Sequence, residues 1–89
     1  MSLLNNMELI KYTLSVRGMR CGACESHIND VIRKNFAVKK VKSNRHKKIV
    51  EIFSINPLDE ENLIETIEKT GYPCLGIIEK QIVKKRFLL

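Results

Sequence analysis

The sequence predicts an α+β domain in which two helices cover one face of a four-stranded antiparallel sheet. Two observations lead to this prediction. Short segments alternate between apolar and polar residues, as half-buried strands do, and two longer segments carry apolar residues at helical spacing. With 89 residues, 44% of them hydrophobic and 29% charged, the chain has room for one folded domain with a modest core.

The first strand and the first helix have clear patterns. The strand is predicted over residues 8–16, because apolar residues occupy alternate positions there: Ile10, Tyr12, Leu14 and Val16. Gly18 then allows a turn of the backbone. The helix is predicted from about Gly22 to Asn35, where apolar residues recur at helical spacing: Cys24, Ile28, Val31 and Ile32.

Three further strands complete the predicted sheet. β-Branched residues are frequent at residues 38–42 and 49–55, and residues 43–46 between them are polar and turn-forming, so these segments predict a hairpin. Residues 75–81 predict a short last strand.

A second helix is expected between the hairpin and the last strand. Asn56 is a good N-cap and Pro57 suits the first helical position. Lys69 suits the last turn, and Gly71 can adopt the left-handed conformation that ends a helix. The predicted buried residues of this helix are Leu63, Ile64 and Ile67.

The order strand, helix, strand, strand, helix, strand is that of the ferredoxin-like, split βαβ arrangement. We expect this domain to span residues 8–81. Residues 1–7 are predicted to be a disordered or vector-derived N-terminus, and residues 82–89 a basic and apolar tail. Such a tail could pair with a sheet edge, a second copy or an anionic membrane.

Two closely spaced cysteines are the candidate functional group. Cys21 lies on the loop after the first strand, and Cys24 lies at the start of the helix. The exposed N–H groups of a helix start lower the pKa of a thiol by stabilising the thiolate, which is the form that binds metal. Two thiolates select soft ions such as Cu(I), Ag(I) and Hg(II).

Residues 18–24, Gly-Met-Arg-Cys-Gly-Ala-Cys, resemble the signature of the heavy-metal-associated domains, found in copper chaperones and at the N-termini of metal-pumping P-type ATPases. The resemblance runs from about Glu8 to Gln81. It implies that Cys21 and Cys24 bind Cu(I) and pass it on by ligand exchange, with no reaction catalysed. Zn(II)-binding members tend to place an acidic residue near the motif; we expect none here, so the resemblance favours Cu(I), with an Hg(II)- or Zn(II)-binding member of the family as the alternative.

The same resemblance implies roles for three other residues. Met19 packs under the loop, and Tyr72 either lies close to the metal without binding it or simply covers the edge of the core. Cys74 falls at a position that is commonly small and apolar, so we expect it in the core; the alternative is a third thiolate that serves a trigonal centre or a metal-bridged dimer. Otherwise the chain is expected to be a monomer.

Other functions fit the sequence less well. A Cys-x-x-Cys redox protein typically has an aromatic residue before the first cysteine and a proline between the two, where this chain has Arg20 and Gly-Ala. Structural zinc needs four ligands, and His27 and His46 are interpreted as surface residues. An RNA-recognition module shares this topology but needs several aromatics on its central strands, and residues 47–53 contain one.

The net charge of +6 favours an acidic protein surface, nucleic acid or anionic lipid as a partner, without distinguishing among them. We expect docking through the lysine-rich hairpin, including Lys39, Lys40 and Lys47, to the metal-binding domain of a transport ATPase or a similar acidic acceptor. No apolar run reaches the roughly 20 residues that cross a bilayer, and no signal peptide is recognisable, so a cytoplasmic location with only indirect membrane contact is expected.

Overall fold

The computed structural model describes the backbone of residues 4–88 and the side chains of residues 8–83. Its elements are β1 (Leu4–Val16), α1 (Gly22–Asn35), β2 (Lys40–Asn44), β3 (Ile49–Ser54), α2 (Glu60–Lys69) and β4 (Cys74–Leu88). The four strands form one antiparallel sheet in the order β2-β3-β1-β4. This is the ferredoxin-like fold that the sequence predicts.

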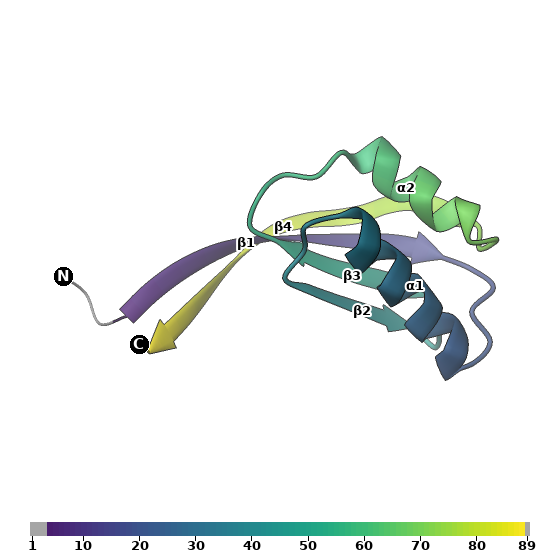
Figure 1. Ribbon diagram of the computed structural model, residues 1–89, viewed down its shortest axis with the longest axis horizontal. Coiled ribbons are helices and arrows are strands. Elements are labelled where there is room, and N and C mark those ends of the chain that lie inside the picture. The colour runs from purple at the N-terminus through teal and green to yellow at the C-terminus, as the bar shows by residue number, and fades with distance from the viewer. Residues whose placement is uncertain (1–3, 89) are drawn as a thin grey trace.

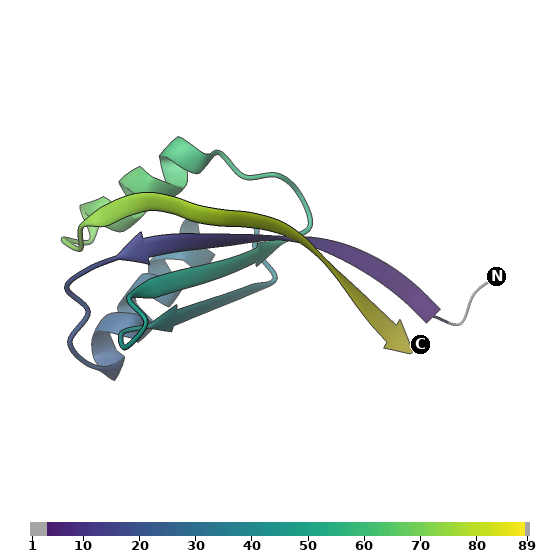
Figure 2. The ribbon, with the colours of Figure 1, turned by 180° about the vertical axis from the view of Figure 1, so that it is seen from behind.

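Within residues 4–88, the two helices lie on one face of the sheet and no element covers the other face (Figures 1 and 2). The core between the layers contains the alternating residues of β1 and the predicted helix positions Ile28, Ile32, Leu63 and Ile67. Because the helices bury only one face, the side chains of β1 must alternate between core and open face, which explains the period of two in the sequence.

Helix α2 begins later than the sequence predicts. Its N-cap is Asp59, whose side chain accepts a hydrogen bond from the Asn62 N–H at 3.3 Å, and not Asn56. The reason is a long-range contact: the Leu58 N–H donates to the Tyr12 hydroxyl at 2.9 Å, which holds residues 56–58 outside the helix. The helix ends as predicted, with Gly71 at a φ of +98°.

The hairpin turn also differs from its prediction. Strand β2 continues to Asn44, and the turn falls at residues 45–48 instead of 43–46. The Asn44 side chain fixes this turn, because its oxygen accepts hydrogen bonds from the backbone of His46 and Lys47 at 3.0 and 2.9 Å.

Strands β1 and β4 are longer than predicted. They pair from Val16 and Cys74 to Leu4 and Leu88, with bulges in β4 at Leu75 and Ile78, so most of both predicted tails lies in the sheet. Residues 1–3 and 89 lie outside the described residues. The paired ends project beyond β2 and β3 as a two-stranded arm, seen at the N and C labels of Figures 1 and 2. None of the helices in residues 4–88 combines the length and hydropathy that crossing a bilayer requires.

Candidate metal-binding site

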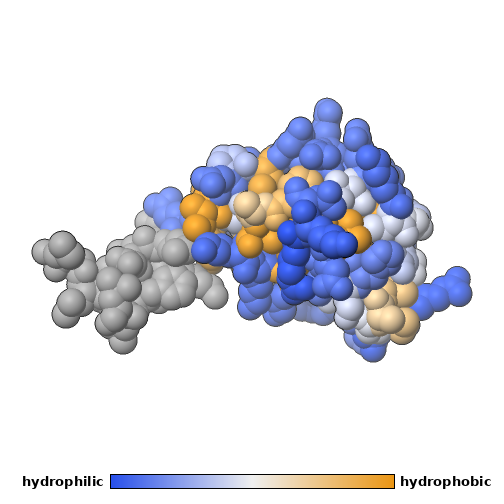
Figure 3. Space-filling model, viewed as in Figure 1, coloured by the Kyte–Doolittle hydropathy of each residue, from blue (hydrophilic) through white to orange (hydrophobic). Residues whose placement is uncertain are grey.

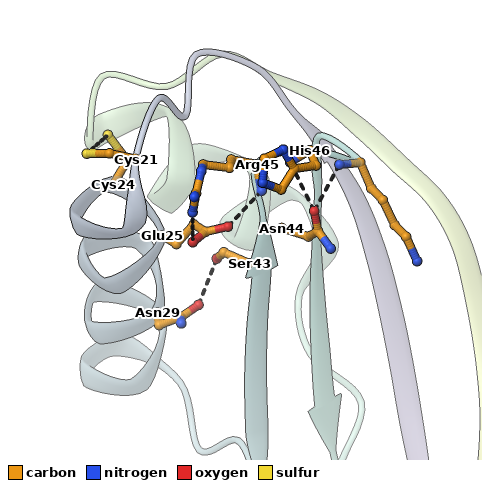
Figure 4. Close-up of polar contacts among 9 residues, drawn as sticks. Cys21, Cys24, Glu25, Asn29, Ser43, Asn44, Arg45 and His46 are labelled. Atoms are coloured by element: carbon orange, nitrogen blue, oxygen red, sulfur yellow. Dashed lines mark hydrogen bonds and ion pairs between the residues drawn. The ribbon is translucent and has the colours of Figure 1, made fainter.

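The two cysteines of the motif meet at the start of α1. Cys21 is the N-cap residue in an extended conformation, and Cys24 lies in the first turn. The Cys24 and Glu25 N–H groups donate to the Cys21 carbonyl oxygen at 3.1 and 3.3 Å, which turns the chain so that both side chains project from the same end of the helix. Their Sγ atoms are 3.8 Å apart (Figure 4). Cys21 is exposed and Cys24 half-buried, so an incoming ion or thiolate can reach the pair.

The surroundings of Cys24 favour its thiolate. Its pKa is lowered from 9.0 to about 7, first by a hydrogen bond from the Tyr72 hydroxyl and then by the backbone N–H groups of Arg20 and Cys21. The same hydrogen bond raises the pKa of Tyr72, because an ionised hydroxyl could no longer donate to Cys24. Donors aimed at a sulfur stabilise its negative charge, so about half of Cys24 is deprotonated near pH 7.

Tyr72 is held beside the motif by the backbone of two loops. The Arg17 N–H donates to the Pro73 carbonyl oxygen at 2.9 Å, which joins the loop before α1 to the loop after α2. Gly18 has a φ of +88°, and a Cβ there would lie 3.5 Å from the Tyr72 ring. His27, one turn along α1, packs edge-on against that ring with centroids 6.5 Å apart. Gly18 and His27 therefore both lie next to the Tyr72 ring.

The structure separates the other candidate residues from the sulfur pair. Met19 is buried and belongs to the core cluster. Cys74 is 7% exposed at the start of β4, and burial raises the pKa of its thiol. His27 and His46 are exposed. Within residues 8–83, no three side chains of His, Cys, Asp or Glu lie close enough together to hold a metal ion as a group.

Glu25 is a residue that the sequence prediction passed over. It directly follows Cys24 and is the acidic residue nearest to the motif in the chain. Its carboxylate turns toward the hairpin and accepts hydrogen bonds from the backbone N–H and the guanidinium of Arg45, both at 2.8 Å (Figure 4). Arg45 lowers the pKa of this carboxyl. One turn later Asn29 accepts a bond from Ser43 at 2.7 Å, so α1 is tied to the hairpin twice.

No local signal in the sequence identifies the Glu25–Arg45 contact. The two residues are 20 positions apart and belong to different elements. Because both carboxylate oxygens of Glu25 are bonded to Arg45, this contact joins α1 to the hairpin.

One protein-family model matches the part of the chain that contains this motif. The model of the heavy-metal-associated domain matches residues 13–73, which include both cysteines and Tyr72. The chain therefore belongs to the heavy-metal-associated domain family. It is a heavy-metal-binding domain with a Cys-x-x-Cys pair, a type of module that is typically non-catalytic. A comparison with curated proteins gave no match.

Solved structures agree with this assignment. The yeast copper transporter domain solved in apo and Cu(I)-loaded states has a TM-score of 0.73 and 26% identity, covering 81% of this chain and 99% of its own. The N-terminal domain of a potential copper-translocating P-type ATPase from Bacillus subtilis, solved with Cu(I), has a TM-score of 0.72 and 25% identity over 82% of this chain and 91% of its own. The N-terminal domain of ZntA in its Zn(II) form, at 21% identity and a TM-score of 0.68, covers 75% of this chain and 90% of its own and shares the fold.

Proposed function

We propose that this protein is a Cu(I) metallochaperone of the cytoplasm. Cys21 and Cys24 take up Cu(I) and pass it to the metal-binding domain of a P-type ATPase, or to a similar acidic acceptor, by thiolate exchange. The observation that carries this proposal is the pair of Sγ atoms 3.8 Å apart on an accessible loop, with no third metal-binding side chain grouped with them among residues 8–83.

The ligand set favours a soft ion of low coordination number. Two thiolates suit Cu(I), whereas a structural zinc site requires four protein ligands and a catalytic one usually three. Glu25 is the acidic side chain that could have completed a zinc site, and it is bonded to Arg45. Two of the similar structures are described in Cu(I)-loaded states. Ag(I) and Hg(II) fit the same two sulfurs.

Transfer requires that an acceptor reach the ion before it leaves. Cys21 is exposed, so an acceptor thiolate can approach the copper from the side of this residue. As each sulfur of this protein releases the ion, it must carry a negative charge. The Tyr72 hydroxyl and the N–H groups near Cys24 stabilise that charge and so ease release to another thiolate.

Exposed basic residues surround the entrance to this site. Arg17 and Arg20 lie on the motif loop, and Lys47 and Lys48 lie on the hairpin turn. The Val16 N–H donates to the Lys48 carbonyl oxygen at 3.0 Å, so the turn and the loop occupy the same end of the domain. This charge would attract an acidic acceptor and speed encounter.

The lysines expected to form one docking face are separated in the structure. Lys47 lies on the turn beside the motif, whereas Lys39 and Lys40 lie at the opposite end of β2, where the Lys40 Nζ is 6.0 Å from the centroid of the Phe53 ring. They therefore provide a matched control. Lys47→Glu with Lys48→Glu should slow copper transfer to an acidic acceptor domain at low salt, and Lys39→Glu with Lys40→Glu should leave it nearly unchanged. Equal slowing by both pairs would contradict docking at the turn.

Metal binding is tested by anaerobic titration of the reduced protein with Cu(I) against a competing chelator. We expect one ion per chain, loss of binding in Cys21→Ser and in Cys24→Ser, and retention in Cys74→Ser. A parallel titration with Zn(II) and Hg(II) distinguishes the other metals of the family. If the protein cannot compete for Cu(I) but forms a reversible Cys21–Cys24 disulfide that changes an activity, it is a redox protein instead.

A further inference from the structure

The two-stranded arm consists of residues 4–9 of β1 paired with residues 83–88 of β4. Strand β3 pairs with β1 only from Ile10, which opposes Ser54, to Ser15. In the described part of the chain, the edge of β1 that faces β3 in the body is therefore open along residues 4–9. The longest dimension of the molecule, 47 Å against 25 and 22 Å, runs along this arm (Figure 1).

The arm lies outside the residues that the family model matches, 13–73. The yeast domain uses 99% of its own length to cover 81% of this chain. An isolated two-stranded ribbon is at best marginally stable in water, and its open edges present unpaired backbone groups. A long ribbon of this kind is stabilised when a further strand pairs with it.

The two edges of the arm differ in their continuity with the body. The free edge of β4 carries bulges at Leu75 and Ile78 in the body, but it is regular from Glu79 to Leu88, along the whole arm. Strand β1 has no such irregularity: its residues pair consecutively with β3 and with β4. What distinguishes the β1 edge is that it continues in line with β3, whose pairing with β1 stops at Ile10.

Backbone directions identify the groups that face this open edge. In the body, the Val16 N–H points toward the hairpin, where it donates to the Lys48 carbonyl oxygen, and the Arg17 N–H points toward Pro73 on the other side. Directions alternate along a regular strand, so even-numbered residues face the β3 side. In the arm, the N–H and C=O groups of Leu4, Asn6 and Glu8 face the open edge.

We propose that a second copy of this chain pairs with the arm through residues 4–8 of β1, antiparallel about a two-fold axis at Asn6. The hydrogen-bonded pairs are then Asn6 with Asn6 of the second copy, and Leu4 with Glu8 of the second copy in both directions. This register gives roughly six backbone hydrogen bonds. An axis moved to Met7 would set Leu4 against Ile10, which is already paired with Ser54.

Charge and surface support a second copy as the occupant. The only charged residue in residues 4–9 is Glu8, and the register sets it against Leu4, so no like charges oppose each other. In the proposed dimer the two β1 strands lie in the middle and each β4 lies outside its own β1. The basic residues 84–86 of the two copies are therefore separated by both β1 strands. At the end of β3, where the strand of the second copy arrives, Ile55 is 44% exposed, and apolar surface reaches the base of the arm in Figure 3.

Proline substitutions test which edge pairs. Asn6→Pro removes an N–H that faces the open β1 edge, and Arg86→Pro, directly opposite in the arm, removes one that faces the open β4 edge. In sedimentation equilibrium of the reduced protein with a metal chelator, we expect wild type and Arg86→Pro to reach twice the mass of one chain and Asn6→Pro to remain at one. A monomeric wild type, or loss of the dimer in Arg86→Pro alone, would overturn the proposal.

Cross-linking tests the position of the axis independently of stability. In a chain with Cys21, Cys24 and Cys74 changed to Ser, Asn6→Cys places two thiols on residues about 5.5 Å apart between Cα atoms, within disulfide range. Asn5→Cys opposes Met7 of the second copy, which leaves the two thiols out of range. Mild oxidation should therefore link the first variant and not the second. Equal linking, or none in either, contradicts this register.

Discussion

Replacing Tyr72 by Phe should raise the pKa of Cys24 while leaving the fold intact. The Tyr72 hydroxyl is the largest of the contributions that lower this pKa to about 7, and the half-buried ring itself is retained in the variant. The N–H groups of Arg20 and Cys21 remain, so we expect a value between about 7 and the ordinary 9.0. If the pKa of Cys24 rises by one unit, the fraction of Cys24 present as thiolate at pH 7 falls from about one half to roughly one tenth.

The assay is the pH dependence of Cys24 alkylation by iodoacetamide, because only the thiolate reacts. It is done on metal-free protein with Cys21→Ser and Cys74→Ser, so that one thiol is followed. Tyr12→Phe is the matched control: it removes the other tyrosine hydroxyl of the chain, which bonds to Leu58 far from the motif. An unchanged alkylation profile in Tyr72→Phe would show that the backbone N–H groups of Arg20 and Cys21 lower the pKa without the hydroxyl, and would refute the role given to Tyr72.

Three further predictions concern stability. Tyr12→Phe should lower the free energy of unfolding by about 1 to 2 kcal/mol in urea titrations, because the Leu58 N–H loses its partner; a change near zero would mean that water replaces it. The Glu25 carboxyl has a lowered pKa, so its pairing with Arg45 stabilises the fold above the ordinary value of 4.5 and is lost as pH falls through the lowered value. Wild type should therefore lose its advantage over Glu25→Gln in acid, and a constant difference down to pH 2 would argue against the ion pair. Cys74→Ser should cost about 1 to 3 kcal/mol, since it buries a hydroxyl, yet leave Cu(I) affinity unchanged; weaker Cu(I) binding would place Cys74 at the site.

The elements that carry the motif could be predicted because their signals are local. Alternation along β1 and helical spacing along α1 reflect which face each element buries, and burial selects apolar side chains residue by residue. The motif therefore falls at a strand-to-helix junction that can be located from the sequence. The end of α2 was equally predictable, since Gly71 adopts a positive φ that other residues avoid.

Errors arose where a distant residue competes with a local preference. Asn56 and Pro57 are good residues for a helix start. However, the Leu58 N–H donates to the Tyr12 hydroxyl, and the helix begins only at Glu60. The length of β4 was underestimated for a similar reason. Its second half is basic, and its inclusion in the sheet depends on pairing with β1 from the other end of the chain.

The sequence by itself determined the topology, the position of the cysteine pair at the start of α1 and the kind of ion that two thiolates attract, because each follows from residue types at short spacing. Only the tertiary structure decided which side chains reach that pair. It brings Tyr72 to Cys24 and turns Glu25 to Arg45, and it buries Cys74, as the family resemblance had implied. These contacts join segments far apart in the chain, and no local preference specifies them, because they exist only after the helices have packed on the sheet.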